Sequence, residues 1–229
     1  MNDTFLLSNI VPQDLDNNGD FWNRLEIYCR DLSKKFNDVR ITSGPLWLAV
    51  EECDQIENEN SSKSPKLLSN GRPCKPHKTM TYPVIGKNEI SVPTHLYKII
   101  IAEDPLLDMP LLAAFVVPNE PIPKNARLVD FQIPLSDLER KVGFRFHVQL
   151  DRNNVSDLCS VDGCSLMRFR DFQAFFIRRG INGARNINEL ERYWRQANKY
   201  DLDSDDEIKK IYNSRLEEIN KTDAVKNHS

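Results

Sequence analysis

The sequence of 229 residues has no run that is long and apolar enough to span a membrane. It also lacks a P-loop, a glycine-rich dinucleotide-binding turn and a Gly-x-Ser-x-Gly elbow, which argues against the enzyme classes that depend on these motifs. The formal net charge is only −3, which does not favour a protein coated by nucleic acid over its whole surface, although a local basic patch is compatible with it. The first three residues form neither a basic n-region nor an arginine-rich presequence, so a targeting signal is either absent or upstream.

Cysteine is scarce, odd in number and scattered, at positions 29, 53, 74, 159 and 164. Disulfide frameworks usually show an even set of cysteines, so this pattern predicts a reducing compartment. Cys159 and Cys164 have no second Cys or His pair at the spacing of a zinc site, so we expect no structural zinc.

Short apolar runs predict β-strands at residues 4–7, 39–42, 81–85, 95–102 and 111–117. Gly44-Pro45 is expected to break the second strand, which residues 46–50 can then continue. Helical spacing predicts one helix that starts near Asp20 and another at 135–142. Residues 52–80 are rich in Ser, Asn, Lys and Pro, which is typical of a long mobile loop. These elements predict an α+β domain over residues 1–150.

The character of the sequence changes after residue 150. Three apolar stripes with helical spacing follow, which predicts a helical extension with its own core over residues 151–229. Between Ser165 and Tyr200, eight basic residues stand against three acidic ones among several aromatic residues. Such a patch can bind phosphates and stack bases, or it can be an ordinary solvated face over an aromatic core. The acidic tail after Asp201 either folds back on the patch or keeps the protein in solution. The candidate nucleic-acid-binding residues are Arg168, Arg178, Arg179 and Arg185.

A candidate metal site lies at the start of the first helix. Residues 14–20 are typical of a polar turn, Asn18 lies just before the helix, and Glu26 and Arg30 are close enough to pair on one flank of it. An amide suits Mg²⁺ better than zinc, a carboxylate can orient a metal-bound water, and an arginine can stabilise a phosphate. The same residues also have a structural interpretation, as a helix cap and a surface ion pair.

Several motifs occur in the order of one known family: SNIVPQ, DNN, WNRLEIYCR, SGPL, YPVIGKNEISVPTHLYK and AFVVPNEPI. The sequence resembles the DNA/RNA non-specific ββα-metal nucleases, and among them the mitochondrial exo/endonuclease G branch, over nearly its whole length. The resemblance implies a Mg²⁺-dependent nuclease (Mn²⁺ as a substitute) that acts on DNA and RNA in endo or 5′-exo mode, forms a homodimer and resides in mitochondria. It implies that Asn18 is the metal ligand and that Asn9, Glu26 and Arg30 support metal and phosphate. It also implies that the C-terminal helices shape how a DNA strand is held.

The sequence departs from this family in one motif. The family carries an Arg-Gly-His motif upstream, whose histidine is the general base, and we expect this sequence to begin downstream of it. No histidine here follows Arg-Gly; the four are His77, His95, His147 and His228. Loss of a general base costs about 10²–10⁴-fold in rate, so we expect an incomplete ββα-metal core that is nearly inactive alone. The alternatives are a catalytically dead nucleic-acid-binding or decoy subunit that pairs with a full-length relative, and a truncated product that folds poorly.

Overall fold

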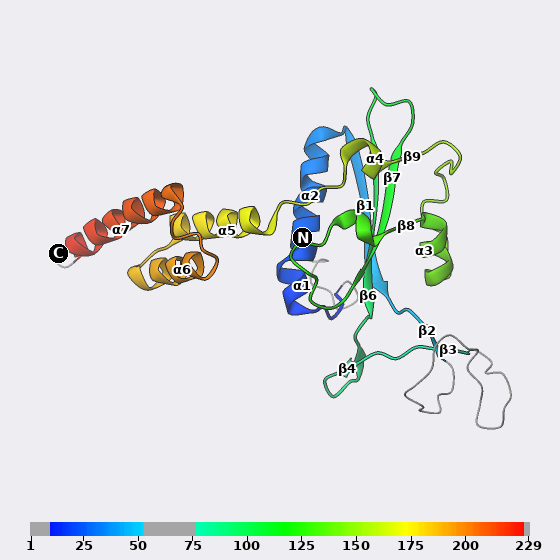
Figure 1. Cartoon of the computed structure of the whole chain (residues 1–229), viewed down its shortest axis with the longest axis horizontal. Helices are drawn as coiled ribbons and strands as arrows, with labels where there is room; N and C mark the ends of the chain where they lie inside the picture. The colour runs from blue at the N-terminus through cyan, green and yellow to red at the C-terminus, as the bar shows by residue number, and fades with distance from the viewer. Residues whose placement is uncertain (1–9, 53–76, 227–229) are drawn as a thin grey trace, which may run out of the picture. The chain divides into compact units, whose positions relative to one another are not determined.

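The computed structural model describes residues 10–52 and 77–226, and the chain divides into two compact units, 1–165 and 166–229 (Figure 1). The sequence placed this division at residue 150. The structure places it later because β9 (Ser156–Asp157) pairs in parallel with β7 (Leu111–Pro118) of the first unit. Helix α4 (Leu158–Asp162) follows β9 directly. A two-residue strand has no periodicity, so no sequence pattern could mark it.

The first unit is built on a mainly antiparallel sheet, which confirms the predicted α+β class. Its strand order is β1 (Asp38–Leu46), β6 (His95–Glu103), β7 and β8 (Gln132–Ile133), and β9 joins the edge of β7. Two small antiparallel pairs stand apart from it: β2 (Val50–Glu52) with β3 (His77–Thr79), and β4 (Val84–Ile85) with β5 (Ile90–Ser91). The predicted strand at 81–85 is therefore reduced to two residues. The predicted strand at 4–7 lies outside the described residues.

The prediction that Gly44-Pro45 breaks the second strand is wrong, because β1 continues through both residues to Leu46. Gly44 lies opposite Tyr97, and a Cβ atom at Gly44 would stand 2.4 Å from the Tyr97 hydroxyl. Glycine is therefore required by a close approach within the strand and not by a turn. Pro45 is tolerated because β1 is an edge strand in the described part of the chain, with β6 as its neighbour.

Helices cover both faces of this sheet, with α2 (Phe21–Lys35) on one side and α3 (Leu135–Val142) on the other (Figure 1). Strand β6 is buried from Leu96 to Ala102, as expected for a strand covered on both faces. Side chains alternate along it. Tyr97, Ile99 and Ile101 join the cluster that includes Leu138 of α3. The intervening residues, among them Lys98, face α2.

The remaining helices of the first unit are short. Helix α1 (Leu15–Gly19) precedes α2, and a 3-10 turn, η3 (Leu128–Phe131), precedes β8. No helix among the described residues is long and apolar enough to cross a membrane.

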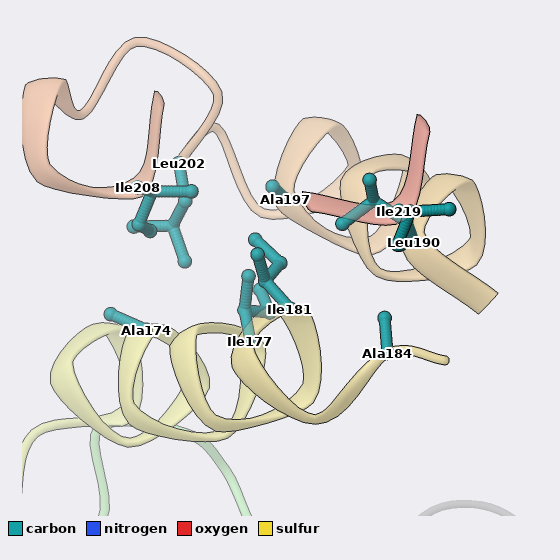
Figure 2. Close-up of a cluster of buried hydrophobic side chains, with 9 residues drawn as sticks. All are labelled: Ala174, Ile177, Ile181, Ala184, Leu190, Ala197, Leu202, Ile208 and Ile219. Carbon is teal, nitrogen blue, oxygen red and sulfur yellow. The ribbon is translucent and has the colours of Figure 1, made fainter. Parts of the chain in front are cut away.

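The second unit contains the three helices that the sequence predicted: α5 (Phe169–Gly183), α6 (Ile187–Lys199) and α7 (Asp206–Lys226). Their apolar stripes meet in one core (Figure 2), which is made of Ala174, Ile177, Ile181, Ala184, Leu190, Ala197, Leu202, Ile208 and Ile219. Trp194 of α6 and Tyr212 of α7 stack beside it, with ring centroids 4.4 Å apart. The unit therefore has a hydrophobic core of its own.

Gly180→Ala should lower the free energy of unfolding by about 1–3 kcal/mol, the usual cost of overpacking. A Cβ atom at Gly180 of α5 would lie 2.2 Å from Cε1 of Tyr193 on α6. This cost should outweigh the gain of about 1 kcal/mol that alanine brings to a helix. Gly183→Ala is the matched control, because no atom lies within 4 Å of its added Cβ. Urea unfolding of both variants checks this, and equal stability of the two would contradict the helix packing.

Candidate functional site

The corner between α1 and α2 is held by hydrogen bonds of two aspartate side chains, Asp14 and Asp20. The predicted polar turn at residues 14–20 instead contains helix α1, because the Asp14 carboxylate accepts a hydrogen bond from the Asn17 backbone N–H at 2.8 Å and caps it. Asp20 occupies the N-cap of α2, as predicted, and its carboxylate accepts from Arg24 Nε at 2.7 Å. Both helices therefore start at fixed points on either side of Asn18.

Two asparagines tie this corner to the end of β7. Asn17 is 1% exposed, and its Nδ2 donates to the Pro118 carbonyl at 2.7 Å. Asn119 accepts from the Asp14 backbone N–H at 2.8 Å and donates to the Pro93 and Pro12 carbonyls at 2.9 and 3.2 Å. The corner is thus a rigid part of the sheet's end and not a free loop.

Of the predicted site residues, Asn18 lies in α1 at this corner, while Glu26 and Arg30 follow in the second and third turns of α2. Asn18 and Arg30 are exposed, and Glu26 is half-buried. None of these three side chains forms a hydrogen bond or ion pair with another residue in the described part of the chain, and the expected Glu26–Arg30 pair is not formed. Asn9, the fourth predicted residue, lies outside the described residues. The surface-pair interpretation therefore does not account for Glu26 and Arg30.

The donors at this corner fit a hydrated Mg²⁺ ion. Mg²⁺ takes few protein oxygens and keeps several waters, which suits one exposed amide oxygen near one carboxylate. Asn17 Oδ1 and Gln13 Nε2 are also buried here without a hydrogen-bond partner in the residues described. No cluster of three or more His, Cys, Asp or Glu residues that could hold a metal occurs in residues 10–52 and 77–226.

The two histidines whose side chains are described lie on the opposite face of the sheet. His95 and Lys98 are three residues apart on β6, so their side chains lie on opposite faces of the sheet. Burial lowers the pKa of His95, the charge of Glu120 opposes this change, and the charge of Lys141 on α3 adds to it. His147 Nε2 lies 3.1 Å from Thr42 Oγ1, on the α3 side of β1. Neither imidazole is therefore placed to act as a base at the α2 corner. The side chains of His77 and His228 lie outside the described structure.

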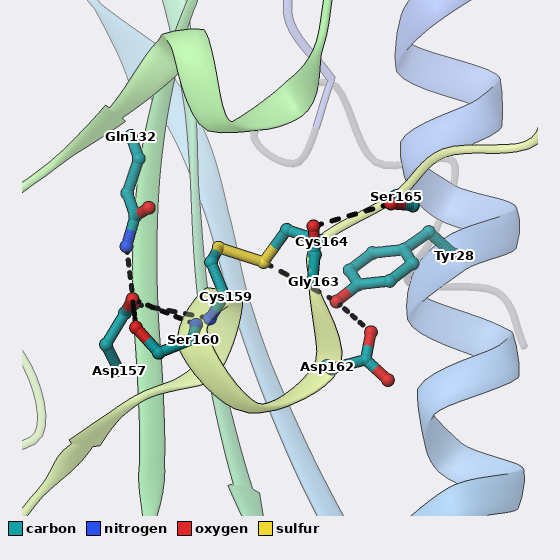
Figure 3. The surroundings of a disulfide bond; sticks show 9 residues. All are labelled: Tyr28, Gln132, Asp157, Cys159, Ser160, Asp162, Gly163, Cys164 and Ser165. Atoms are coloured by element: carbon teal, nitrogen blue, oxygen red, sulfur yellow. Dashed lines mark hydrogen bonds between the residues drawn. A yellow bond between two sulfur atoms is a disulfide. The ribbon is translucent and has the colours of Figure 1, made fainter.

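A disulfide joins Cys159 to Cys164 around α4, which the sequence did not predict (Figure 3). The expectation that the scattered cysteines are reduced is wrong for this pair, since the α4 turn brings the two Cα atoms to 4.7 Å. Asp162 within the loop accepts hydrogen bonds from Tyr28 at 2.7 Å and Lys35 at 2.6 Å, both on α2. The disulfide loop is thereby attached to the helix that carries Glu26 and Arg30.

The predicted basic patch of the second unit is partly neutralised. Arg168 pairs with Asp171 at 2.7 Å, and Arg178 pairs with Glu207 at 3.0 Å. The start of the acidic tail therefore folds back on Arg178. Arg179 and Arg185 are exposed, and their guanidinium groups form no ion pair within the described residues.

Residues 1–153 match the family described as DNA/RNA non-specific endonuclease. The chain belongs to the DNA/RNA non-specific endonuclease family. It is 40% identical to the mitochondrial nuclease EXOG of Danio rerio over 230 residues, which cover 100% of this chain and 61% of that protein. The human EXOG is 40% identical over 96% of this chain and 55% of its own length, and a mitochondrial nuclease of Saccharomyces cerevisiae is 37% identical over 75% of this chain and 48% of its own.

The membership confirms the family resemblance read from the motifs, and the named relatives support a mitochondrial location. The chain spans about 61% of the Danio rerio nuclease and less of the others. A solved structure of an EndoG/EndoGI complex shares the fold, with a TM-score of 0.54 and 32% identity over 67% of this chain and 54% of that chain.

Proposed function

We propose that this chain carries the metal and phosphate half of a Mg²⁺-dependent nuclease that hydrolyses phosphodiester bonds in DNA and RNA, in endo and 5′-exo mode. The observation that carries the proposal is that the Asn18 amide at the corner, and the Glu26 carboxylate and Arg30 guanidinium further along α2, are all free of hydrogen bonds within the described residues. Asn18 would hold the magnesium ion, which supplies charge stabilisation for the leaving oxygen when bound. Mn²⁺ should substitute for it.

The protein groups divide the remaining work among them. Glu26, half-buried on α2, would accept a hydrogen bond from a metal-bound water and so orient it. Arg30, one turn further along the exposed helix surface, would bind a phosphate oxygen. Asn9 would support the same group of ligands, as the family resemblance implies.

Among the described residues, neither His95 nor His147 is placed to act as the general base, since both lie on the α3 face. We therefore expect the chain alone to cleave DNA and RNA poorly, and expect cleavage to appear when a segment with an Arg-Gly-His motif is joined upstream. The experiment compares supercoiled DNA and RNA as substrates for both proteins, with Mg²⁺ and with EDTA. Cleavage that persists in EDTA would contradict the metal assignment, and no cleavage by the joined protein would contradict the nuclease proposal.

The second candidate is a nucleic-acid-binding or decoy subunit without catalysis, which could pair with a second copy or a full-length relative. Arg179 and Arg185 favour it, because both are exposed and form no ion pair within the described residues, so the second unit offers free positive charge to phosphates. Salt-sensitive DNA binding without cleavage by any form of the protein would identify this function. Sedimentation of the chain alone would report whether it dimerises.

Arg179→Gln with Arg185→Gln should weaken DNA binding and lower the salt slope of the binding constant by about 1 for each of the two arginines that neutralises a phosphate. Arg168→Gln is the matched control, because its charge is already paired with Asp171. Titrations at several salt concentrations measure both slopes. Equal decreases in the double variant and the control would show that the patch does not bind through its unpaired arginines.

A further inference from the structure

One lysine lies buried in the sheet directly under α2. Lys98 is 5% exposed and interrupts the apolar run of β6, on the α2 face. Its Nζ donates to Ser43 Oγ at 2.8 Å and lies 4.5 Å from the centroid of the Trp22 ring. Among the described residues, no carboxylate forms an ion pair with it. Lys98 is therefore a buried cation held by a hydroxyl and an aromatic face.

Such a group is costly to bury. Moving an ammonium group out of water without a carboxylate partner is unfavourable, and an apolar residue of similar volume is usually at least as stable. Burial lowers the pKa of Lys98, and the charges of Cys29 and Glu26 act against that shift. The cation–π contact with Trp22 offsets part of the cost. Packing alone does not explain a lysine at this position.

The neighbours of Lys98 on α2 belong to the proposed site. One face of α2 carries Trp22, Glu26 and Cys29, because these residues are spaced four and three positions apart along the helix. Trp22 stands in the first turn of α2, four residues after Asn18. The Lys98 ammonium group thus lies under the stretch of helix that connects Asn18 to Glu26.

We propose that Lys98 is a positioning residue of the nuclease site, which fixes Trp22 and, through its buried positive charge, attracts and orients Glu26 on the same face of α2. This inference rests on the proposed function. It assigns Lys98 no contact with substrate or metal. Its effect passes through Glu26 and through the position of the first two turns of α2.

Lys98→Met tests the inference, since methionine fills a similar volume without the charge. We expect the urea midpoint to stay the same or rise, while the affinity for Mg²⁺ alone, measured by calorimetry, falls about 10- to 100-fold, as for other residues that orient metal ligands. Amide hydrogen exchange should become faster in the first two turns of α2 and stay unchanged in β6 and β7. Lys34→Met is the control, because Lys34 lies on the same helix with an exposed side chain and should change none of these readouts.

A double-mutant cycle with Glu26→Gln shows whether Lys98 acts through Glu26. In the Glu26→Gln background, Lys98→Met should have little further effect on Mg²⁺ affinity. Three results would each overturn the proposal. They are additive losses of Mg²⁺ affinity in the double variant, a fall in the urea midpoint of Lys98→Met that parallels its loss of affinity, and unchanged Mg²⁺ affinity and amide exchange in Lys98→Met. If the unmodified protein binds no Mg²⁺, the proposed function fails. Amide hydrogen exchange then still tests the positioning role of Lys98. Faster exchange in α2 of Lys98→Met would support that role, and unchanged exchange would overturn it.

Discussion

Asn18→Ala should lower Mg²⁺-dependent cleavage of DNA and RNA by about 10²-fold or more in the protein joined to an Arg-Gly-His segment. A bound metal ion contributes several kcal/mol to stabilisation of the transition state, and each 1.36 kcal/mol is a factor of ten in rate. Removing the exposed amide of Asn18 would leave Glu26 to hold the ion through water. The initial rate at saturating Mg²⁺, and its dependence on Mg²⁺ concentration, measure the loss.

The control for this variant is Asn188→Ala, which removes an exposed amide from α6 in the second unit. It should leave the cleavage rate unchanged. The fold of Asn18→Ala should also be intact, because the Asp14 side chain caps α1, and Asp20 and not Asn18 occupies the N-cap position of α2. Cleavage by Asn18→Ala at the unmodified rate would refute the metal assignment, whatever the control shows.

The second large effect is a loss of stability at alkaline pH. Burial raises the pKa of the Cys29 thiol from 9.0 to about 11, and the positive charge of Lys98 partly opposes this. The folded protein then keeps a proton that the unfolded chain releases above pH 9. The stabilisation is therefore complete below pH 9 and is lost as pH rises through 11, and the loss amounts to about 3 kcal/mol.

Two buried groups near Cys29, Tyr28 of α2 and Lys98 of β6, modify this profile. Burial, and then the hydrogen bond to Asp162, raise the pKa of Tyr28, which adds a further loss of stability above pH 10. Lys98 acts in the opposite sense, because a lowered lysine pKa makes the folded state more stable as pH rises toward 10.5. Cys29→Ala isolates the thiol. The free energy of unfolding, measured with urea, should fall less steeply between pH 8 and pH 11 in this variant than in the unmodified protein. Identical slopes for the two proteins would contradict the burial of an ionisable thiol.

Much of this architecture follows from local sequence patterns. The stripe of Trp22, Leu25, Cys29 and Leu32 predicts α2 and its buried face, and all four side chains are buried in the structure. The C-terminal stripes predict three helices for the same reason, since an apolar face repeats at the helical period. The corner around Asn18 was also found from the sequence, because capping residues mark where a helix begins.

The features that were missed depend on contacts between distant residues. No residue near Lys98 in the sequence shows that its ammonium group donates to Ser43 and lies over the Trp22 ring, since both residues are far away along the chain. Gly44-Pro45 has the composition of a turn, and only the approach of Tyr97 explains the glycine within a strand. The Cys159–Cys164 disulfide depends on the α4 turn, which follows a two-residue strand that no periodicity reveals.

The central claim is that the metal binds at the corner between α1 and α2, and paramagnetic broadening of NMR signals by Mn²⁺ tests it most directly. Substoichiometric Mn²⁺ added to the labelled chain should first broaden the signals of Asn18, Glu26 and their neighbours, and excess Mg²⁺ should restore them. The acidic loop at residues 201–206 is the competing location, because oxygen-rich loops also attract these ions. Broadening that begins in that loop, or that shows no preferred location, would contradict the account.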